Sequence, residues 1–194
     1  MRKQPPKQLK TLENLLQQAE HYSEHMMTGS SGSVPPTLMA LTAEGFIMHI
    51  PHRFNSPDAK DLFAKTIRLM AVGYKASAVA MISESWIVTK KSRDRELDLS
   101  VPPSESPDRE EVVSIMAESR EVRTQRFLFI QRDSFGKFTG FGTSLLPQIQ
   151  DVEGRFAGLL PPKEPTEEMA VAAKNLLQAM GIAIENAGPD PRWN

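Results

Sequence analysis

Hydrophobic side chains recur at two different spacings along the chain, and these spacings predict helices and strands in turn. Residues 6–27 carry apolar side chains at three- and four-residue steps, which is the spacing of one face of an α-helix. The segment Thr37 to Ile50 holds two short apolar runs on either side of Ala43-Glu44-Gly45, where the glycine tolerates the backbone of a tight turn. This segment predicts a β-hairpin.

The middle of the chain predicts a second helix that leads directly into a long strand. Ser56 is a suitable N-cap, Pro57 fits the first helical position, and the helix should run to about Tyr74. The residues expected on its inward face are Leu62, Phe63, Ile67 and Met70. The segment Lys75 to Thr89 is the longest β-like apolar run, and both of its faces begin apolar. It therefore predicts a central strand.

Three further strands and a last helix complete the pattern. The strand candidates are Glu111 to Glu118, Val122 to Arg132 and Lys137 to Leu145. Before them, residues 90–110 are rich in charge and proline, so we expect a flexible loop there. After them, a helix should begin at Thr166 and continue to about Ile184. Its predicted apolar stripe is Met169, Ala173, Leu176, Met180 and Ile184.

The order of these elements predicts the fold class. Helix, two strands, helix, three or four strands and helix make an α+β domain, with a mostly antiparallel sheet of about five to six strands. The 194 residues suit a single domain, which we place at 1–187 with a loose tail at 188–194. The element order resembles that of the roadblock and longin-type folds. This resemblance implies a platform that binds a partner or dimerises.

The composition narrows the classes of function. Lysine and arginine number 23 against 24 aspartate and glutamate, so the formal net charge is -1 and no overall field attracts nucleic acid or an anionic membrane. The absence of cysteine excludes disulfides, thiolate metal sites and a cysteine nucleophile. No apolar stretch approaches the roughly 20 residues that span a bilayer, and the N-terminus lacks a secretory signal pattern. We therefore expect a cytoplasmic protein without a cofactor.

One histidine motif invites comparison with zinc enzymes. His21-Tyr22-Ser23-Glu24-His25 matches H-x-x-E-H, the inverted zincin signature. On a helix, His21 and His25 lie one turn apart and could both bind zinc, with Glu24 beside them as general base. However, the predicted helix is polar, ends a few residues later, and no third ligand stands out downstream. We favour two solvated histidines near a helix C-terminus and assign no metal site.

Glu84 is the most distinctive carboxylate, because it stands among apolar neighbours on the predicted central strand. A buried carboxylate needs a partner or takes a raised pKa, and Arg109, Arg123 or Arg126 could pair with it. Asp108 and Arg109 could place acid and base groups at the mouth of the sheet, or form a solvated strand start. The candidate catalytic residues are Glu84, Asp108 and Arg109. The candidate binding residues are Trp86, Glu84, Arg109 and Arg126.

Arginine and phenylalanine alternate along the strand Val122 to Arg132. These residue types stack on bases and contact phosphates in nucleic-acid-binding sheets. Alternation, however, puts Phe127 and Phe129 on one face and Arg126 and Arg132 on the other. This arrangement is more typical of a strand with an aromatic core face than of a nucleic-acid platform.

Two short segments resemble a pattern in uncharacterised bacterial and phage proteins of this size. They are Ser83-Glu84-Ser85-Trp86 and Ser106-Pro107-Asp108-Arg109-Glu110-Glu111, separated by a polar loop that contains proline. The resemblance covers the middle third of the chain and implies a bacterial or phage origin. It implies no active site.

Three hypotheses of function follow from the sequence. The favoured one is a small accessory protein that binds a macromolecular partner, either another protein or a second copy of itself, because no convergent catalytic set is present. The second is a small metal-dependent or carboxylate-using hydrolase. The third is a nucleic-acid-binding module.

Overall fold

A computed structural model describes residues 7–89, 100–142, 149–150 and 154–182. The hairpin, the middle helix and the long strands form where the sequence predicts them. Residues 90–99 of the expected flexible loop, the segment 143–145, Ile184 and the tail 188–194 lie outside the described residues. The helices are α1 (Lys7–Thr28), α2 (Pro57–Gly73), η1 (a 3-10 turn, Pro103–Glu105) and α3 (Glu167–Ala179). The strands are β1 (Thr37–Thr42), β2 (Gly45–His49), β3 (Ala78–Val88), β4 (Arg109–Ser119), β5 (Arg123–Arg132), β6 (Phe138–Gly142) and β7 (Ile149–Gln150).

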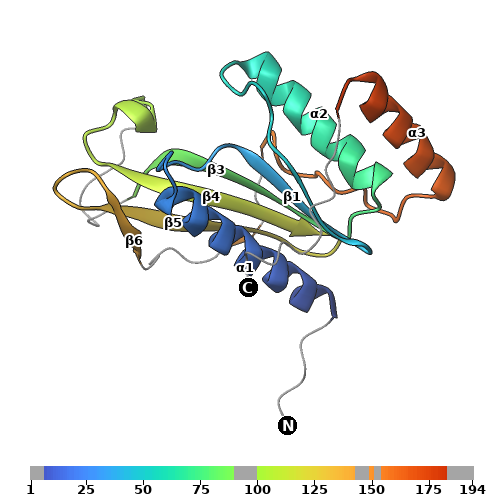
Figure 1. Ribbon diagram of the computed structural model, residues 1–194, viewed down its shortest axis with the longest axis horizontal. Coiled ribbons are helices and arrows are strands. Elements are labelled where there is room, and N and C mark those ends of the chain that lie inside the picture. Colours follow the sequence, from blue (N-terminus) through green and yellow to red (C-terminus); the bar gives the residue numbers. More distant parts are fainter. Residues whose placement is uncertain (1–6, 90–99, 143–148, 151–153, 183–194) are drawn as a thin grey trace, which may run out of the picture.

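The strands form one antiparallel sheet in the order β2-β1-β3-β4-β5-β6, and β7 pairs with the start of β5. Helix α1 packs on one face of the sheet, and α2 packs on the other (Figure 1). Helix α3 packs against α2. The predicted α+β class and the order helix, two strands, helix, strands, helix are confirmed. The prediction that Lys75 to Thr89 supplies a central strand is confirmed as well, since β3 pairs with both β1 and β4.

Local sequence signals explain the element boundaries. The Ser56 hydroxyl accepts a hydrogen bond from the Ala59 N–H at 3.1 Å, which satisfies one of the free donors at the start of α2. The two-residue turn Ala43-Glu44 joins β1 to β2, and Gly45 after it has a φ of 123°, a value that side chains disfavour. These short-range preferences do not depend on the rest of the fold.

The sheet has a hydrophobic core on each face. The buried residues on the α1 face include Leu15, Leu16, Tyr22, Met39, Ile82, Val113 and Ile115. Those on the α2 face include Leu38, Ile47, Phe63, Ile67, Met70, Met81 and Leu177. Burial on both sides of β3 explains why the first half of this strand is apolar throughout.

The apolar stripe predicted for the last helix is correct at Ala173 but wrong at Met169, Leu176 and Met180. Helix α3 packs against α2 through Ala170, Ala173 and Leu177, while Met169, Leu176 and Met180 are exposed. The two helices approach closely at this contact, where a Cβ built on Gly73 of α2 would lie 3.2 Å from a carbon of the Lys174 side chain. Leu62 of α2, expected to point inward, is likewise 56% exposed.

A buried carboxylate ties the segment after β7 to the sheet. Glu118, near the end of β4, is only 5% exposed and accepts a hydrogen bond from Arg123 Nε at 3.0 Å on the neighbouring strand. Its Oε2 also accepts the N–H of Gly158 at 2.9 Å, and its Oε1 accepts the N–H of Leu160. A buried charge is tolerated when hydrogen bonds replace its hydration, and here three donors do so.

We expect the Glu118→Gln variant to loosen this segment. The amide nitrogen of glutamine cannot accept a hydrogen bond, so at least one donor loses its acceptor at a cost of about 2 kcal/mol. Urea denaturation should show this loss, and trypsin should cleave after Arg155 faster than in the wild type. The exposed Glu121→Gln variant is the control. If both variants matched the wild type in both assays, Glu118 would not hold the segment.

Candidate functional site

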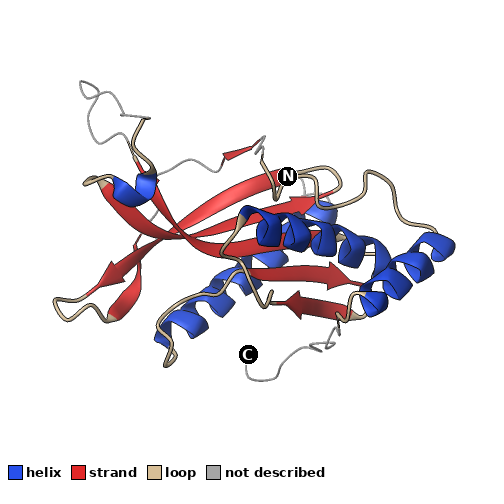
Figure 2. Cartoon of the chain, turned by 90° about the horizontal axis from the view of Figure 1, so that it is seen from above, coloured by secondary structure: helices blue, strands red, loops and turns tan. Residues whose placement is uncertain are grey.

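The long strands extend beyond the α-helices and leave one end of the sheet open (Figure 2). At this end, Trp86 is 40% exposed, and the guanidinium of Arg109 lies over its ring at 4.6 Å from the centroid. Trp86 stands opposite Glu111 in the β3–β4 ladder. Arg132 binds that carboxylate through two nitrogens, at 2.9 and 3.0 Å, and its third donates to the Gly136 carbonyl.

The β5–β6 turn completes this end of the sheet. Phe135 at its tip is 93% exposed, and the Asp133 carboxylate accepts the N–H groups of Phe135 and Lys137, both at 2.9 Å. These bonds hold the turn in one conformation while its aromatic ring stays in solvent. We call the surface formed by Trp86, Arg109, Glu111, Arg132 and Phe135 the open end.

Glu84 lies between the covered and the open parts of the α1 face. Its Oε1 accepts the N–H of Val34 at 2.5 Å, so the connection after α1 crosses over the carboxylate. Burial raises the pKa of Glu84 above its ordinary value of 4.5, and the nearby Glu111 charge raises it further. The Val34 N–H and the Arg132 charge act in the opposite direction.

The arginines proposed as partners of Glu84 bind elsewhere. Arg109 stacks on Trp86 and donates to the Ser104 carbonyl in η1, while Arg123 pairs with Glu118. Arg126 forms an ion pair with Glu20 of α1. The cation whose charge acts on Glu84 is Arg132. Arg132 was not among the partners proposed for Glu84 from the sequence, because its position depends on the β4–β5 register rather than on a local motif.

The structure therefore joins some of the candidate residues and separates others. Glu84, Trp86 and Arg109 share one face of the sheet, at or beside the open end, whereas Arg126 belongs to the part of that face under α1. Asp108 lies immediately before β4, where its N–H is bound by the Ser106 hydroxyl. Glu84 and Arg109 have different partners, so their contacts define no shared catalytic centre.

The histidine motif shows no sign of a metal site. His21, Glu24 and His25 are exposed side chains on α1. Across the described ranges, no group of three or more histidine, aspartate or glutamate side chains is arranged to hold a metal ion. A zinc site needs at least three protein ligands, which this helix alone does not offer.

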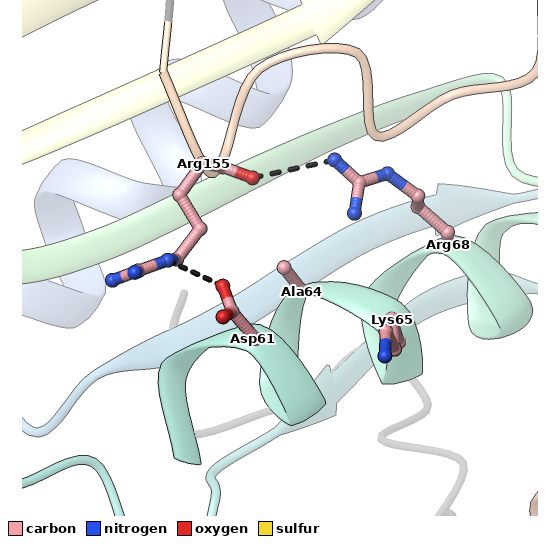
Figure 3. A pocket seen from close by; sticks show the side chains of 5 residues that line it. All are labelled: Asp61, Ala64, Lys65, Arg68 and Arg155. Atoms are coloured by element: carbon pink, nitrogen blue, oxygen red, sulfur yellow. Dashed lines mark hydrogen bonds and ion pairs between the residues drawn. The ribbon is translucent and has the colours of Figure 1, made fainter. Parts of the chain in front are cut away.

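A second feature, unforeseen from the sequence, is a hollow between α2 and residues 154–158 (Figure 3). Its volume is about 420 Å³, and its lining residues are Asp61, Ala64, Lys65, Arg68 and Arg155. The Arg155 Nε lies 2.6 Å from the Asp61 carboxylate, and Arg68 donates to three backbone carbonyls of the facing segment. The approach of Arg155 to α2 has no signal in the sequence, because its segment is far from α2 along the chain.

Comparison of the chain with protein-family models, curated proteins and solved structures gave no significant match. Among the helices of the described segments, none has the length and apolarity needed to cross a membrane.

We expect the Glu84→Gln variant to gain stability over the wild type as the pH rises above 4.5. Because the pKa of Glu84 is raised on folding, the unfolded chain releases this proton first, and wild-type stability falls between 4.5 and the raised pKa. Glutamine does not titrate, and its carbonyl can still accept the Val34 N–H. Urea denaturation at several pH values measures the difference, with Glu44→Gln in the exposed β1–β2 turn as control.

A stability difference that stays constant across this pH range would contradict the expectation. So would a wild type that becomes more stable than the variant as the pH rises, because that result requires the ionised form of Glu84 to be favoured by folding.

Proposed function

We propose that this protein is a non-enzymatic accessory protein of the cytoplasm, of bacterial or phage origin, that binds another protein through the open end. One observation carries the proposal: two exposed aromatic side chains, Trp86 and Phe135, stand at the same end of the sheet, beyond the α-helices. The absence of cysteine fits a reducing compartment.

The composition of the open end suits a protein interface. Tryptophan and arginine are enriched among the residues that dominate binding energy, and stacking of Arg109 on Trp86 orders both side chains before a partner arrives. The bidentate Arg132–Glu111 pair gives a polar rim whose hydrogen bonds are already satisfied. A partner thus covers aromatic surface without leaving a charge unpaired.

The same contacts weigh against a nucleic-acid platform. Three arginines of β5 each form an ion pair with a carboxylate: Arg123 with Glu118, Arg126 with Glu20 and Arg132 with Glu111. Phosphate binding would have to replace these pairs. Phe127 and Phe129 are half-buried, so their faces are not offered for stacking as fully as Trp86 and Phe135 are.

Loss of both aromatic side chains should abolish the complex. We expect the Trp86→Ala/Phe135→Ala variant, tagged and expressed in the native host, to recover at least tenfold less of the partner than the wild type, since buried aromatic anchors contribute about 2 kcal/mol or more each. Quantitative mass spectrometry of the recovered proteins measures this ratio. Sedimentation velocity of the purified wild type and variant shows whether the partner is a second copy.

The matched control is Leu176→Ala, which removes an apolar side chain of similar exposure from α3. It should retain the partner. If Leu176→Ala lost the partner and the aromatic double variant kept it, the open end would be the wrong surface. Equal thermal stability of the two variants is required for the comparison, and the exposure of all three side chains makes this the expected result.

A further inference from the structure

The hollow beside α2 carries an excess of positive charge. Its lining holds three cations, Lys65, Arg68 and Arg155, and one carboxylate, Asp61. The Asp61 carboxylate offsets the charge of Arg155. The remaining two cations, Lys65 and Arg68, form no ion pair with a carboxylate among the described residues. The chain as a whole has a net charge of -1, so this is a local concentration of charge.

Arg68 is fixed in place by its hydrogen bonds. Its Nε donates to the Gly158 carbonyl and its Nη2 to the carbonyls of Arg155 and Ala157, all at 3.3 Å. Carbonyl groups orient the guanidinium but do not cancel its charge. An anion that enters the hollow therefore meets a cation whose position needs no further ordering.

Hydrogen-bond donors remain available on Lys65, on Arg155 and at the Nη1 of Arg68, whose hydrogen bonds within the described segments use only Nε and Nη2. Arg155 uses only its Nε for Asp61, and neither of its terminal nitrogens has a partner in the described part of the chain. The amino group of Lys65, one turn before Arg68 on α2, has none there either. A guanidinium edge and an ammonium group are each suited to bind the oxygens of a tetrahedral anion.

We propose that this hollow binds a small molecule with a phosphate monoester group. The dianionic charge of the phosphate at neutral pH equals the charge excess of the lining, and about 420 Å³ lies within the lower range of small-molecule sites. The buried Ala64 side chain gives the wall an apolar patch against which the organic part of the ester rests. A nucleic acid would require a stripe of cations along the surface, whereas these three cations line one small, open hollow.

The test is a titration of the full-length protein with inorganic phosphate and with phenyl phosphate, followed by amide chemical shifts at constant ionic strength. We expect saturable binding with a dissociation constant of about 1 mM or tighter. The shifts should be confined to α2 and residues 154–158. Tighter binding of phenyl phosphate identifies an ester as the ligand, and equal binding identifies free phosphate; both support the site.

The Lys65→Gln variant should weaken binding about fivefold to tenfold, because it removes one charge-assisted hydrogen bond without disturbing the anchoring of Arg68. Lys137→Gln, at the exposed β5–β6 turn, is the matched control and should bind like the wild type. Shifts that do not saturate, that sodium chloride reproduces, or that persist unchanged in Lys65→Gln would overturn the proposal. None of these results bears on Trp86 and Phe135, so the proposed function is tested separately.

Discussion

The pairing of β3 with β4 is the interaction on which the rest of the structure depends. The ladder runs without interruption from Ala78 opposite Ser119 to Val88 opposite Arg109. Strands of 11 residues extend about 36 Å, whereas a 17-residue helix such as α2 is about 25 Å long. The strands are therefore longer than α2 on one face and slightly longer than the 22-residue α1, about 33 Å, on the other, and one end of the sheet extends beyond both helices (Figure 2).

The two ends of this ladder face different solvation problems. At the covered end, Glu118 is removed from water and needs hydrogen-bond donors from a neighbouring strand and from a distant segment. At the open end, Glu111 keeps a bidentate arginine and remains partly exposed. Glu84 lies between them, with one backbone donor and a neighbouring like charge, and burial raises the pKa of its carboxyl group.

Local signals made most of the fold predictable from the sequence. The Ser56-Pro57 start of α2, the glycine after the β1–β2 turn and the two-sided apolar start of β3 act over a few residues, and the structure confirms all three. The orientation of α3 was not predictable in this way. It depends on how α3 packs against α2, including their close approach at Gly73. The spacing of apolar residues within α3 gives no information about this contact.

The residues of the candidate site that lie on β3 and β4 were predictable from the sequence. Trp86 and Glu84 follow from alternation along β3, and Arg109 follows from the start of β4. Arg155 could not be found, because 87 positions separate it from Arg68 and its segment has no periodic pattern. Electrostatic contacts of the backbone position its segment. The N–H groups of Gly158 and Leu160 donate to the Glu118 carboxylate, and the carbonyls of residues 155, 157 and 158 accept from the Arg68 guanidinium.

Gly158 shows why this segment takes the path it does. Its N–H binds Glu118 and its carbonyl binds Arg68, so one residue links the carboxylate in the sheet to the cation on α2. Its φ of 63° lies in the left-handed region, where glycine carries no steric penalty. The backbone dipoles of the segment are thereby aligned between a negative and a positive group. Because Arg155 lies three residues before Gly158, the same alignment brings its guanidinium to the hollow beside Asp61.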